Sequence, residues 1–290
     1  MVYRILLICN YFSHGTTGLF VLKNLQSLGH SVFLWDARLF PSPPEGEFDI
    51  SLTWTNNTVD VSKIKAKKKV LYYLEDSQYF KGTREGKGLE ELIPHYDYFF
   101  TMNCLPGYEA MWLPMGTDNE IHFKLPEINN ILPVIFIGTA RDDNRIQFAK
   151  ALQESLAQRN IPLVLMGNGW KDLNNILPKA CYYEDFNTVV NQFKIVVNLH
   201  VGNESPSDKV HCIAGCGNAL LLNDNKPAYR DCYPTAPVWD TIHDLMEKII
   251  HYIEHEDERI KLVNEMQQTA YSKFSYLVQL EKLIKIIQEE

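Results

Sequence analysis

The first 35 residues alternate between two hydrophobic periodicities, and this alternation constrains the fold more than any other feature of the sequence. Residues 3–9 are an apolar run that only Arg4 interrupts, which is typical of a strand buried on both faces. Apolar residues then recur at helical spacing over 19–28, and 31–35 is a second apolar run. A strand, a helix and a strand in this order predict a β-α-β unit with parallel strands and a right-handed crossover.

The alternation continues to the middle of the chain and then begins again. The other predicted strands lie at 48–54, 70–74, 96–101, 110–113, 134–137, 162–166, 195–199 and 219–222. The segment 127–133 is polar and proline-flanked, so we place the linker between the two halves there. The tail from Asp240 onward carries apolar stripes at helical spacing. The sequence therefore predicts an α/β protein with two doubly wound halves.

Net charge argues against nucleic acid and anionic membranes as partners. The chain has 28 Lys and Arg against 36 Asp and Glu, a formal net charge of −8, whereas neutralising phosphates requires clustered basic residues. The exception is a lysine cluster made of Lys63, Lys65, Lys67, Lys68 and Lys69. We interpret this cluster as a solvated helix end that leads into a strand.

Cysteine usage and targeting signals favour a cytoplasmic protein. The six cysteines are scattered and none forms a Cys-x-x-Cys pair, so a zinc knuckle or thioredoxin-type motif is not expected. No secretory signal pattern is evident at the N-terminus. No apolar run approaches the roughly 20 residues that span a bilayer, so no transmembrane segment is expected.

The polar and glycine residues of the chain gather where the predicted strands end. In open parallel sheets, ligands bind beyond the carboxyl ends of the strands. The loops at those ends hold residues 14–18, 75–77, 138–145, 167–170 and 200–209. Two sheets that face each other would place these loops on both sides of a cleft.

Seven short motifs occur along the chain in a characteristic order. They are VLYYLEDS at 70–77, WLPMGTD at 112–118 followed by His122, FIG at 136–138 with Arg145, MGNGW at 166–170, VVNLH at 196–200, EHEDER at 254–259 and FSY at 274–276. In this order and spacing they resemble the CgeB-like group of GT-B glycosyltransferases. The resemblance implies a GT-B fold: a Rossmann-like domain over 1–128, a second over 129–274, and a C-terminal helix over 275–290 that packs back on the first domain.

The resemblance also implies a reaction. We expect a sugar to pass from a nucleotide-diphosphate sugar, with UDP as the expected nucleotide, to a hydroxyl of a glycan, protein or small molecule. The C-terminal half would bind the donor and the N-terminal half the acceptor. No tightly bound cofactor and no metal are expected, since the sequence has no Asp-x-Asp motif; Asp142, Asp143 and Asp224 are interpreted as solvated loop carboxylates.

The expected donor site combines cations with glycine-rich turns. Arg145 and Lys209 would neutralise the leaving diphosphate. The turn 167–170 would form a wall of the base pocket, or else a tight turn with a core tryptophan. The expected donor-binding residues are Gly15, Gly138, Arg145, Gly167, Asn168, Gly169, Trp170, Asn198, His200, Asp208 and Lys209.

A catalytic base is expected in the first half if the transfer is inverting, because the acceptor hydroxyl must then lose its proton. Asp76 is the first candidate and His14 the second, ahead of Glu75 and His95. The acceptor side would also contain Thr16, Thr17 and Glu75. The sequence does not distinguish an inverting transfer from a retaining one.

One position departs from the family pattern. The family's helix R-x-F-E-A-x-A-x-G aligns with residues 209–217, and Cys212 takes the place of the Glu that is expected to hold the donor ribose. A thiol cannot act as a two-oxygen acceptor. Either Asp208 or Glu204 substitutes, or backbone groups hold the ribose, or the donor pocket is altered.

Three alternatives stay open. The lysine cluster favours a phage-type enzyme that glucosylates hydroxymethylated DNA bases. Cys212 favours a non-catalytic nucleotide-sugar sensor or scaffold. A sugar-nucleotide epimerase would share the fold and would need no acceptor.

Overall fold

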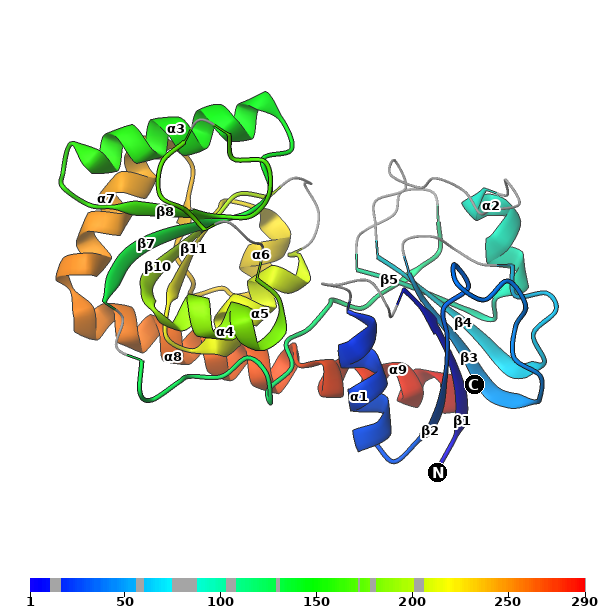
Figure 1. Ribbon diagram of the computed structural model, residues 1–290. Coiled ribbons are helices and arrows are strands. Elements are labelled where there is room, and N and C mark those ends of the chain that lie inside the picture. The colour runs from blue at the N-terminus through cyan, green and yellow to red at the C-terminus, as the bar shows by residue number, and fades with distance from the viewer. Residues whose placement is uncertain are drawn as a thin grey trace. The chain divides into compact units, whose positions relative to one another are not determined.

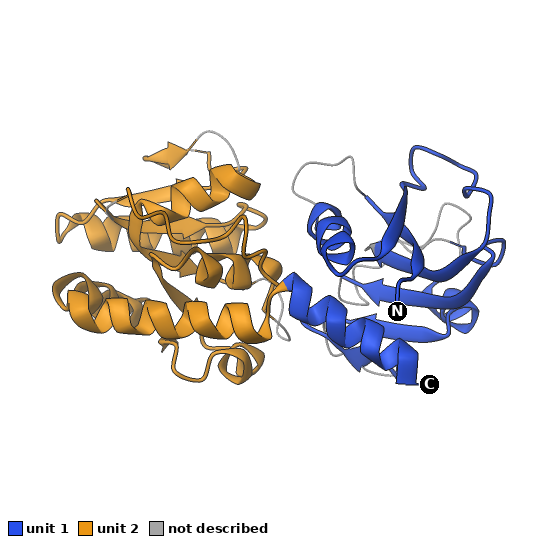
Figure 2. Ribbon diagram, turned by 90° about the horizontal axis from the view of Figure 1, so that it is seen from below, with its two compact units in different colours: residues 1–115, 276–290 blue, residues 116–275 orange. Residues whose placement is uncertain are grey.

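The computed structural model describes residues 1–10, 17–55, 60–74, 88–102, 108–128, 131–171, 173–177, 181–200 and 206–289. The chain forms two compact units (Figure 2). Unit 1 comprises residues 1–115 and 276–290, and unit 2 comprises residues 116–275. Among the described residues each unit contains a six-stranded parallel sheet, so the prediction of two doubly wound α/β halves is confirmed.

Unit 1 is built on strands in the order β2-β1-β3-β4-β5-β6. Its elements are β1 (Arg4–Cys9), α1 (Gly18–Ser27), β2 (Ser31–Trp35), β3 (Phe48–Thr55), β4 (Ala66–Tyr73), α2 (Leu89–Leu92), the 3-10 turn η2 (Ile93–His95), β5 (Tyr98–Thr101), β6 (Met111–Trp112) and α9 (Tyr276–Glu289). Strand β1 pairs with both β2 and β3, and from Ile5 onward it is fully buried, as its apolar run predicts.

The C-terminal helix α9 belongs to unit 1, where it packs against α1 (Figure 1). The Phe20 ring stacks on the Tyr276 ring with centroids 5.2 Å apart. Nearby, the Trp54 and Tyr72 rings stack with their centroids 3.7 Å apart, and the Trp54 indole N–H donates to the Thr17 hydroxyl over 2.8 Å. The expected return of the last helix to the N-terminal domain is therefore confirmed.

Unit 2 has strands in the order β12-β11-β10-β7-β8-β9. Its elements are β7 (Leu132–Ile137), α3 (Asp143–Ala157), β8 (Leu163–Met166), β9 (Ile176–Leu177), α4 (Tyr183–Asn191), β10 (Phe193–Asn198), α5 (Asp208–Cys216), β11 (Leu220–Asp224), α6 (Pro227–Cys232), β12 (Val238–Trp239), α7 (Ile242–Glu254) and α8 (Glu256–Lys273). The strand order reverses between β7 and β10, which is where open α/β sheets bind their ligands.

The segment 116–128, expected in the first domain, is part of unit 2. The Asn187 side chain accepts from the backbone N–H of Phe123, and that of Asn191 accepts from the N–H of Leu125. At the other end of the unit, the Thr117 N–H donates to the carbonyl of Phe274 over 2.8 Å. The chain therefore enters and leaves unit 2 side by side. Within the described ranges, no helix combines the length and apolar character needed to cross a membrane.

Candidate functional site

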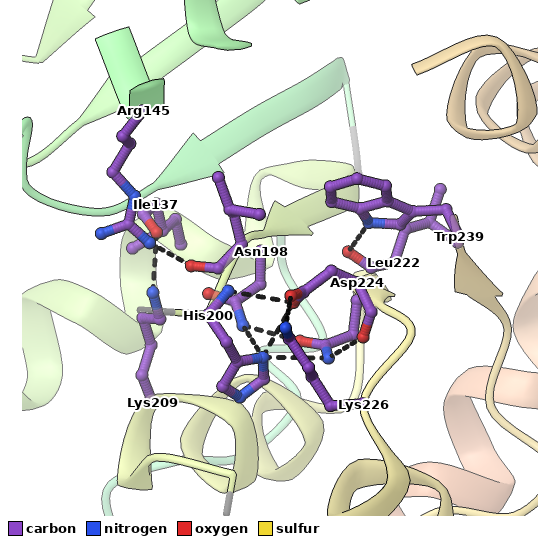
Figure 3. Close-up of polar contacts among 11 residues, drawn as sticks. Ile137, Arg145, Asn198, His200, Lys209, Leu222, Asp224, Lys226 and Trp239 are labelled. Carbon is purple, nitrogen blue, oxygen red and sulfur yellow. Dashed lines mark hydrogen bonds and ion pairs between the residues drawn. The ribbon is translucent and has the colours of Figure 1, made fainter. Parts of the chain in front are cut away.

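Polar side chains of unit 2 gather at the carboxyl ends of β7, β10 and β11 (Figure 3). This edge of the sheet includes the strand-order reversal between β7 and β10. Helices α3 and α5 both begin there, so their free N–H groups add positive potential to the same edge.

Arg145 lies in the first turn of α3, whose N-cap is Asp142. The Asp142 carboxylate accepts from the backbone N–H of Arg145 over 2.9 Å, which fixes where the helix starts. The guanidinium turns back to the strand ends, where it donates to the carbonyls of Leu199 and Thr139. It is only 5% exposed, and burial lowers its pKa although Asp142 opposes the shift.

Lys209 lies in the first turn of α5, and its ammonium donates to the carbonyl of Ile137 over 2.8 Å. Burial is the main cause that lowers the pKa of Lys209 to about 7, and the positive charge of Arg145 is the second. The negative charges of Asp208 and Asp224 oppose the shift. Neither cation forms an ion pair with a carboxylate of the described residues. Two neighbouring positive charges are thus held by neutral carbonyls.

The loops after β7 and β8 are locked together. Gly138 donates from its N–H to the carbonyl of Met166, and its own carbonyl accepts from the Trp170 indole over 2.9 Å. A Cβ on Gly167, whose φ is +133°, would lie 2.1 Å from the carbonyl oxygen of Gly138. Trp170 is 4% exposed and packs against Phe136, so it fixes the turn from the core side.

Asn168 and Gly169 complete this turn. The carbonyl of Asn168 accepts from the N–H of Ala140 over 2.8 Å. Gly169 has a φ of +87° and faces Ala140 at close range. The loop that follows β8 therefore supports the loop that follows β7. The β7 loop leads into α3, the helix that carries Arg145.

His200 and Asp224 form a buried pair at the ends of β10 and β11 (Figure 3). The Asp224 carboxylate lies 2.8 Å from Nδ1 of His200 and also accepts from the His200 backbone N–H over 2.9 Å. Burial alone would raise the pKa of Asp224, but the hydrogen bonds from His200 lower it below its ordinary value. Lys226 lies 3.7 Å from the other carboxylate oxygen.

The interpretation of Asp224 as a solvated loop carboxylate is therefore wrong. Its side chain is 9% exposed, and its partner comes from the neighbouring strand. Asn223, which the sequence reasoning also missed, accepts from the Asn198 amide over 2.6 Å. The signal that could have found both residues is their position directly after a buried strand, the same rule that selected His200.

Asp208 and Cys212 lie one turn apart on α5. The Asp208 carboxylate accepts from the backbone N–H of Lys209, and burial raises its pKa. The Cys212 thiol is buried and lies 3.9 Å from the carbonyl of Gly116. Because burial raises its pKa well above the ordinary value, Cys212 is a neutral thiol.

The expected residues of the first half are mostly outside the described residues. This holds for His14, Gly15, Thr16, Glu75 and Asp76. Two others have defined surroundings. The Thr17 hydroxyl is buried and accepts from Trp54, so it supports the unit 1 core. His95 precedes β5 and thus lies at the amino end of the strand, away from the ligand-binding edge.

The lysine cluster begins strand β4, but a turn and not a helix end precedes it. Lys67 pairs with Asp49 at 2.8 Å, while Lys68 and Lys69 donate to the Tyr98 hydroxyl and the Val61 carbonyl. These side chains lie toward the amino end of the sheet. Three of the five lysines that favoured DNA as a partner therefore have contacts within unit 1, while Lys63 and Lys65 are exposed. Across all of the described ranges, no group of three or more His, Cys, Asp or Glu side chains could hold a metal ion.

Comparison with protein families gives the site its context. Residues 144–285 match a family model described as glycosyl transferase-like. The chain contains a glycosyltransferase domain. The matched range includes Arg145, Lys209, His200 and Asp224, whereas β7 and Gly138 precede it. The prediction of a glycosyltransferase is confirmed.

Three solved structures show the same fold over nearly the whole chain. An alpha-glucosyltransferase in complex with UDP and a 13-mer DNA with a central A:G mismatch has 14% identity, covers 99% of this chain and 100% of its own, and has a TM-score of 0.69. AviGT4, a glycosyltransferase of avilamycin A biosynthesis, has 12% identity, coverage of 97% and 96%, and a TM-score of 0.61. HepE of Anabaena, in complex with UDP and glucose, has 10% identity, coverage of 99% and 100%, and a TM-score of 0.59.

The architecture is GT-B, as expected. A search of curated protein sequences finds no relative of this chain. The resemblance to the CgeB-like group stays a prediction.

Proposed function

We propose that the protein transfers a sugar from a UDP-sugar to a hydroxyl of a carbohydrate, protein or small-molecule acceptor, and that unit 2 binds the donor. The observation that carries this proposal is the pair of cations, Arg145 and Lys209, which donate to backbone carbonyls and form no ion pair with a carboxylate of the described residues. Burying a cation without a counter-ion costs free energy. A diphosphate between the two side chains would remove this cost.

The same two side chains suit the chemistry of the transfer. When the bond from the sugar to the diphosphate breaks, negative charge develops on the leaving group. Arg145 and Lys209 are held in place by carbonyls before the ligand arrives, so little reorganisation is needed. The N-termini of α3 and α5 add their partial positive charges. The leaving group is thus stabilised without a metal.

We assign the base to the β8 side of the cations. There the turn 167–170 is held in place, because the Trp170 indole and the Asn168 carbonyl form hydrogen bonds within the unit. The other backbone groups of the turn would contact the base. Uracil is the proposed base because two of the similar structures were solved with UDP. The ribose would be held by backbone groups or by Asp208, since Cys212 is a buried neutral thiol.

The acceptor and the catalytic base are proposed for unit 1. Strands β1 and β4 lead into the segments that hold His14 and Asp76. Asp76 is the first candidate base and His14 the second, with Glu75, Thr16 and Thr17 on the acceptor side. We also propose a cytoplasmic location.

The test is ligand-induced stabilisation followed by turnover. We expect UDP and at least one UDP-sugar to raise the melting temperature, while ADP and GDP do so less. A ligand at a hundredfold excess over Kd contributes about 2.7 kcal/mol. Arg145→Gln and Lys209→Gln should abolish the shift, whereas the exposed controls Arg159→Gln and Lys150→Gln should keep it.

Turnover then distinguishes an enzyme from a sensor. A glycosyltransferase releases UDP from a UDP-sugar, faster when a suitable acceptor is present. Binding without any release of UDP would favour a nucleotide-sugar sensor. No stabilisation by any nucleotide, or full stabilisation in both cation variants, would contradict the proposed donor site.

A further inference from the structure

The imidazole of His200 is fixed on one edge and unpartnered on the other. Its side chain is 8% exposed. The nearest group to Nδ1 is the Asp224 carboxylate at 2.8 Å; the amide nitrogens of Asn223 and Asn198 lie at 3.1 Å and 3.5 Å, and the Nε2 edge points away from Asp224 (Figure 3). Nε2 is buried and has no hydrogen-bond partner among the described residues. A carboxylate at Nδ1 selects the tautomer with its proton on Nδ1, so Nε2 of the neutral ring is an acceptor.

A second unpartnered acceptor lies two residues earlier on the same strand. The Asn198 amide nitrogen donates to Asn223, and the Asn223 amide nitrogen donates to the Asp224 carbonyl over 2.8 Å. This chain of bonds fixes the orientation of the Asn198 amide. Its oxygen Oδ1 is therefore left as a buried acceptor without a partner in the described part of the chain. Two such acceptors fit a ligand that presents several hydroxyl donors.

We propose that His200 Nε2 and Asn198 Oδ1 accept hydrogen bonds from hydroxyls of the donor's sugar, and that Asp224 is the positioning residue that holds His200 for this task. This inference rests on the proposed function. It adds two sugar-recognition residues, His200 and Asn198, and a positioning residue, Asp224, to the diphosphate-binding cations.

The order of the strands places the sugar at this pair. The cations donate to carbonyls at the ends of β7 and β10, the central strands of the sheet. The proposed base wall follows β8, on one side of them, while Asp224 ends β11 on the other side. A nucleotide-diphosphate sugar has its diphosphate between base and sugar. With the base toward β8, the sugar lies toward β11.

The experiment separates the sugar from the nucleotide. Calorimetry would give Kd values for UDP, UDP-glucose, UDP-galactose and UDP-N-acetylglucosamine with the full-length chain. His200→Asn keeps an amide near Nδ1 and removes Nε2. We expect its Kd for UDP to stay within twofold of the wild type, and its Kd for the preferred UDP-hexose to rise at least fivefold. His200→Gln, whose amide reaches the Nε2 position, should recover part of this loss.

Asp224→Asn tests the positioning role. We expect a smaller loss of UDP-hexose affinity, again with UDP unaffected, and a change in the His200 tautomer that is detected by nitrogen-15 NMR. His243→Asn and Asp244→Asn, which change exposed or half-buried side chains of the same unit, serve as matched controls. The NMR spectrum of the wild type also tests the tautomer directly, independent of how the variants fold.

The possible failures are distinguishable. A wild type that binds none of the UDP compounds overturns the proposed function and this inference with it. A wild type that binds them, with equal losses for UDP and UDP-hexose in His200→Asn, overturns only the sugar assignment. Unchanged affinities in that variant, or a wild-type proton on Nε2 alone, also overturn the inference while leaving the donor site in place.

Discussion

The ammonium of Lys209 donates to the carbonyl of Ile137, which lies 72 residues earlier at the end of β7. This bond joins the start of α5 to a central strand of the sheet. A carbonyl satisfies the donor but does not neutralise its charge, and Arg145 beside it adds repulsion. The site is therefore held in a state that an anion would stabilise.

The first prediction concerns the pH dependence of donor binding. Burial and the charge of Arg145 lower the pKa of Lys209 to about 7 in the free protein. A bound diphosphate would raise it again, so binding takes up a proton once the pH exceeds 7. We expect the Kd for UDP-glucose to rise by about fivefold between pH 7 and 8, and the slope to approach about tenfold per pH unit above pH 8. Calorimetry across this range measures it.

Lys209→Arg is the control for this prediction, because its guanidinium remains charged throughout. Its Kd should be nearly flat over the same range. A flat profile in the wild type would show that Lys209 is fully protonated without ligand, contrary to the effect of its burial.

The second prediction concerns the junction of the β7 and β8 loops. Gly167→Ala places a Cβ 2.1 Å from the carbonyl oxygen of Gly138, at a φ of +133°. We expect it to lower the free energy of unfolding by at least about 3 kcal/mol. Gly29→Ala is the matched control: Gly29 also has a positive φ, +85°, but an added Cβ there has no atom within 4 Å. This variant should lower the free energy of unfolding by only about 1–2 kcal/mol. Urea denaturation compares them, and equal costs would contradict the role of close approach.

Local patterns predicted the strands of both described sheets except β9 and β12, the two-residue edge strands of unit 2. Runs such as 5–9 and 134–137 are buried on both faces, so these strands could be found from their own residues. Arg145 and Lys209 were found because they follow strand ends, which is a rule of chain order. These features depend on neighbours in sequence.

The partners of the site residues depend on the order of the strands, which chain order does not give. Asp224 seemed isolated because its partner His200 lies 24 residues earlier, and the two meet only because β10 pairs with β11. Trp170 similarly bonds Gly138 across the β7–β8 pair. The attachment of 116–128 to unit 2 rests on asparagine side chains that no periodicity marks.

The third prediction concerns acid stability. His211 is fully buried, Nδ1 lies 2.8 Å from the Tyr233 hydroxyl, and burial, with a smaller effect of His200, lowers its pKa to about 3. Unfolding restores a pKa near 6.5. Between these values the unfolded state binds more protons, so stability falls as the pH drops. We expect a slope of about 1.4 kcal/mol per pH unit from this group.

The measurement is the difference in unfolding free energy between the wild type and His211→Asn from pH 4 to 7, because the shared contribution of other groups cancels. The difference should shrink as the pH falls. His243→Asn, an exposed control, should track the wild type at every pH. A constant difference for His211→Asn would mean that His211 can be protonated in the folded state.

The last prediction sets stability against binding at one side chain. Lys209→Met removes a charge that burial disfavours and keeps a flexible apolar chain of similar length. Without ligand, we expect the free energy of unfolding at pH 7 to rise by about 1–2 kcal/mol. Because the pKa of Lys209 is about 7 in the folded protein and 10.5 in the unfolded chain, this gain is largest at pH 7 and below, and it becomes smaller toward pH 10, where the wild-type amine folds in its neutral form. UDP should no longer raise the melting temperature of the variant. If the variant is instead less stable than the wild type and is still stabilised by UDP, the ammonium of Lys209 supports the core and does not contact the ligand.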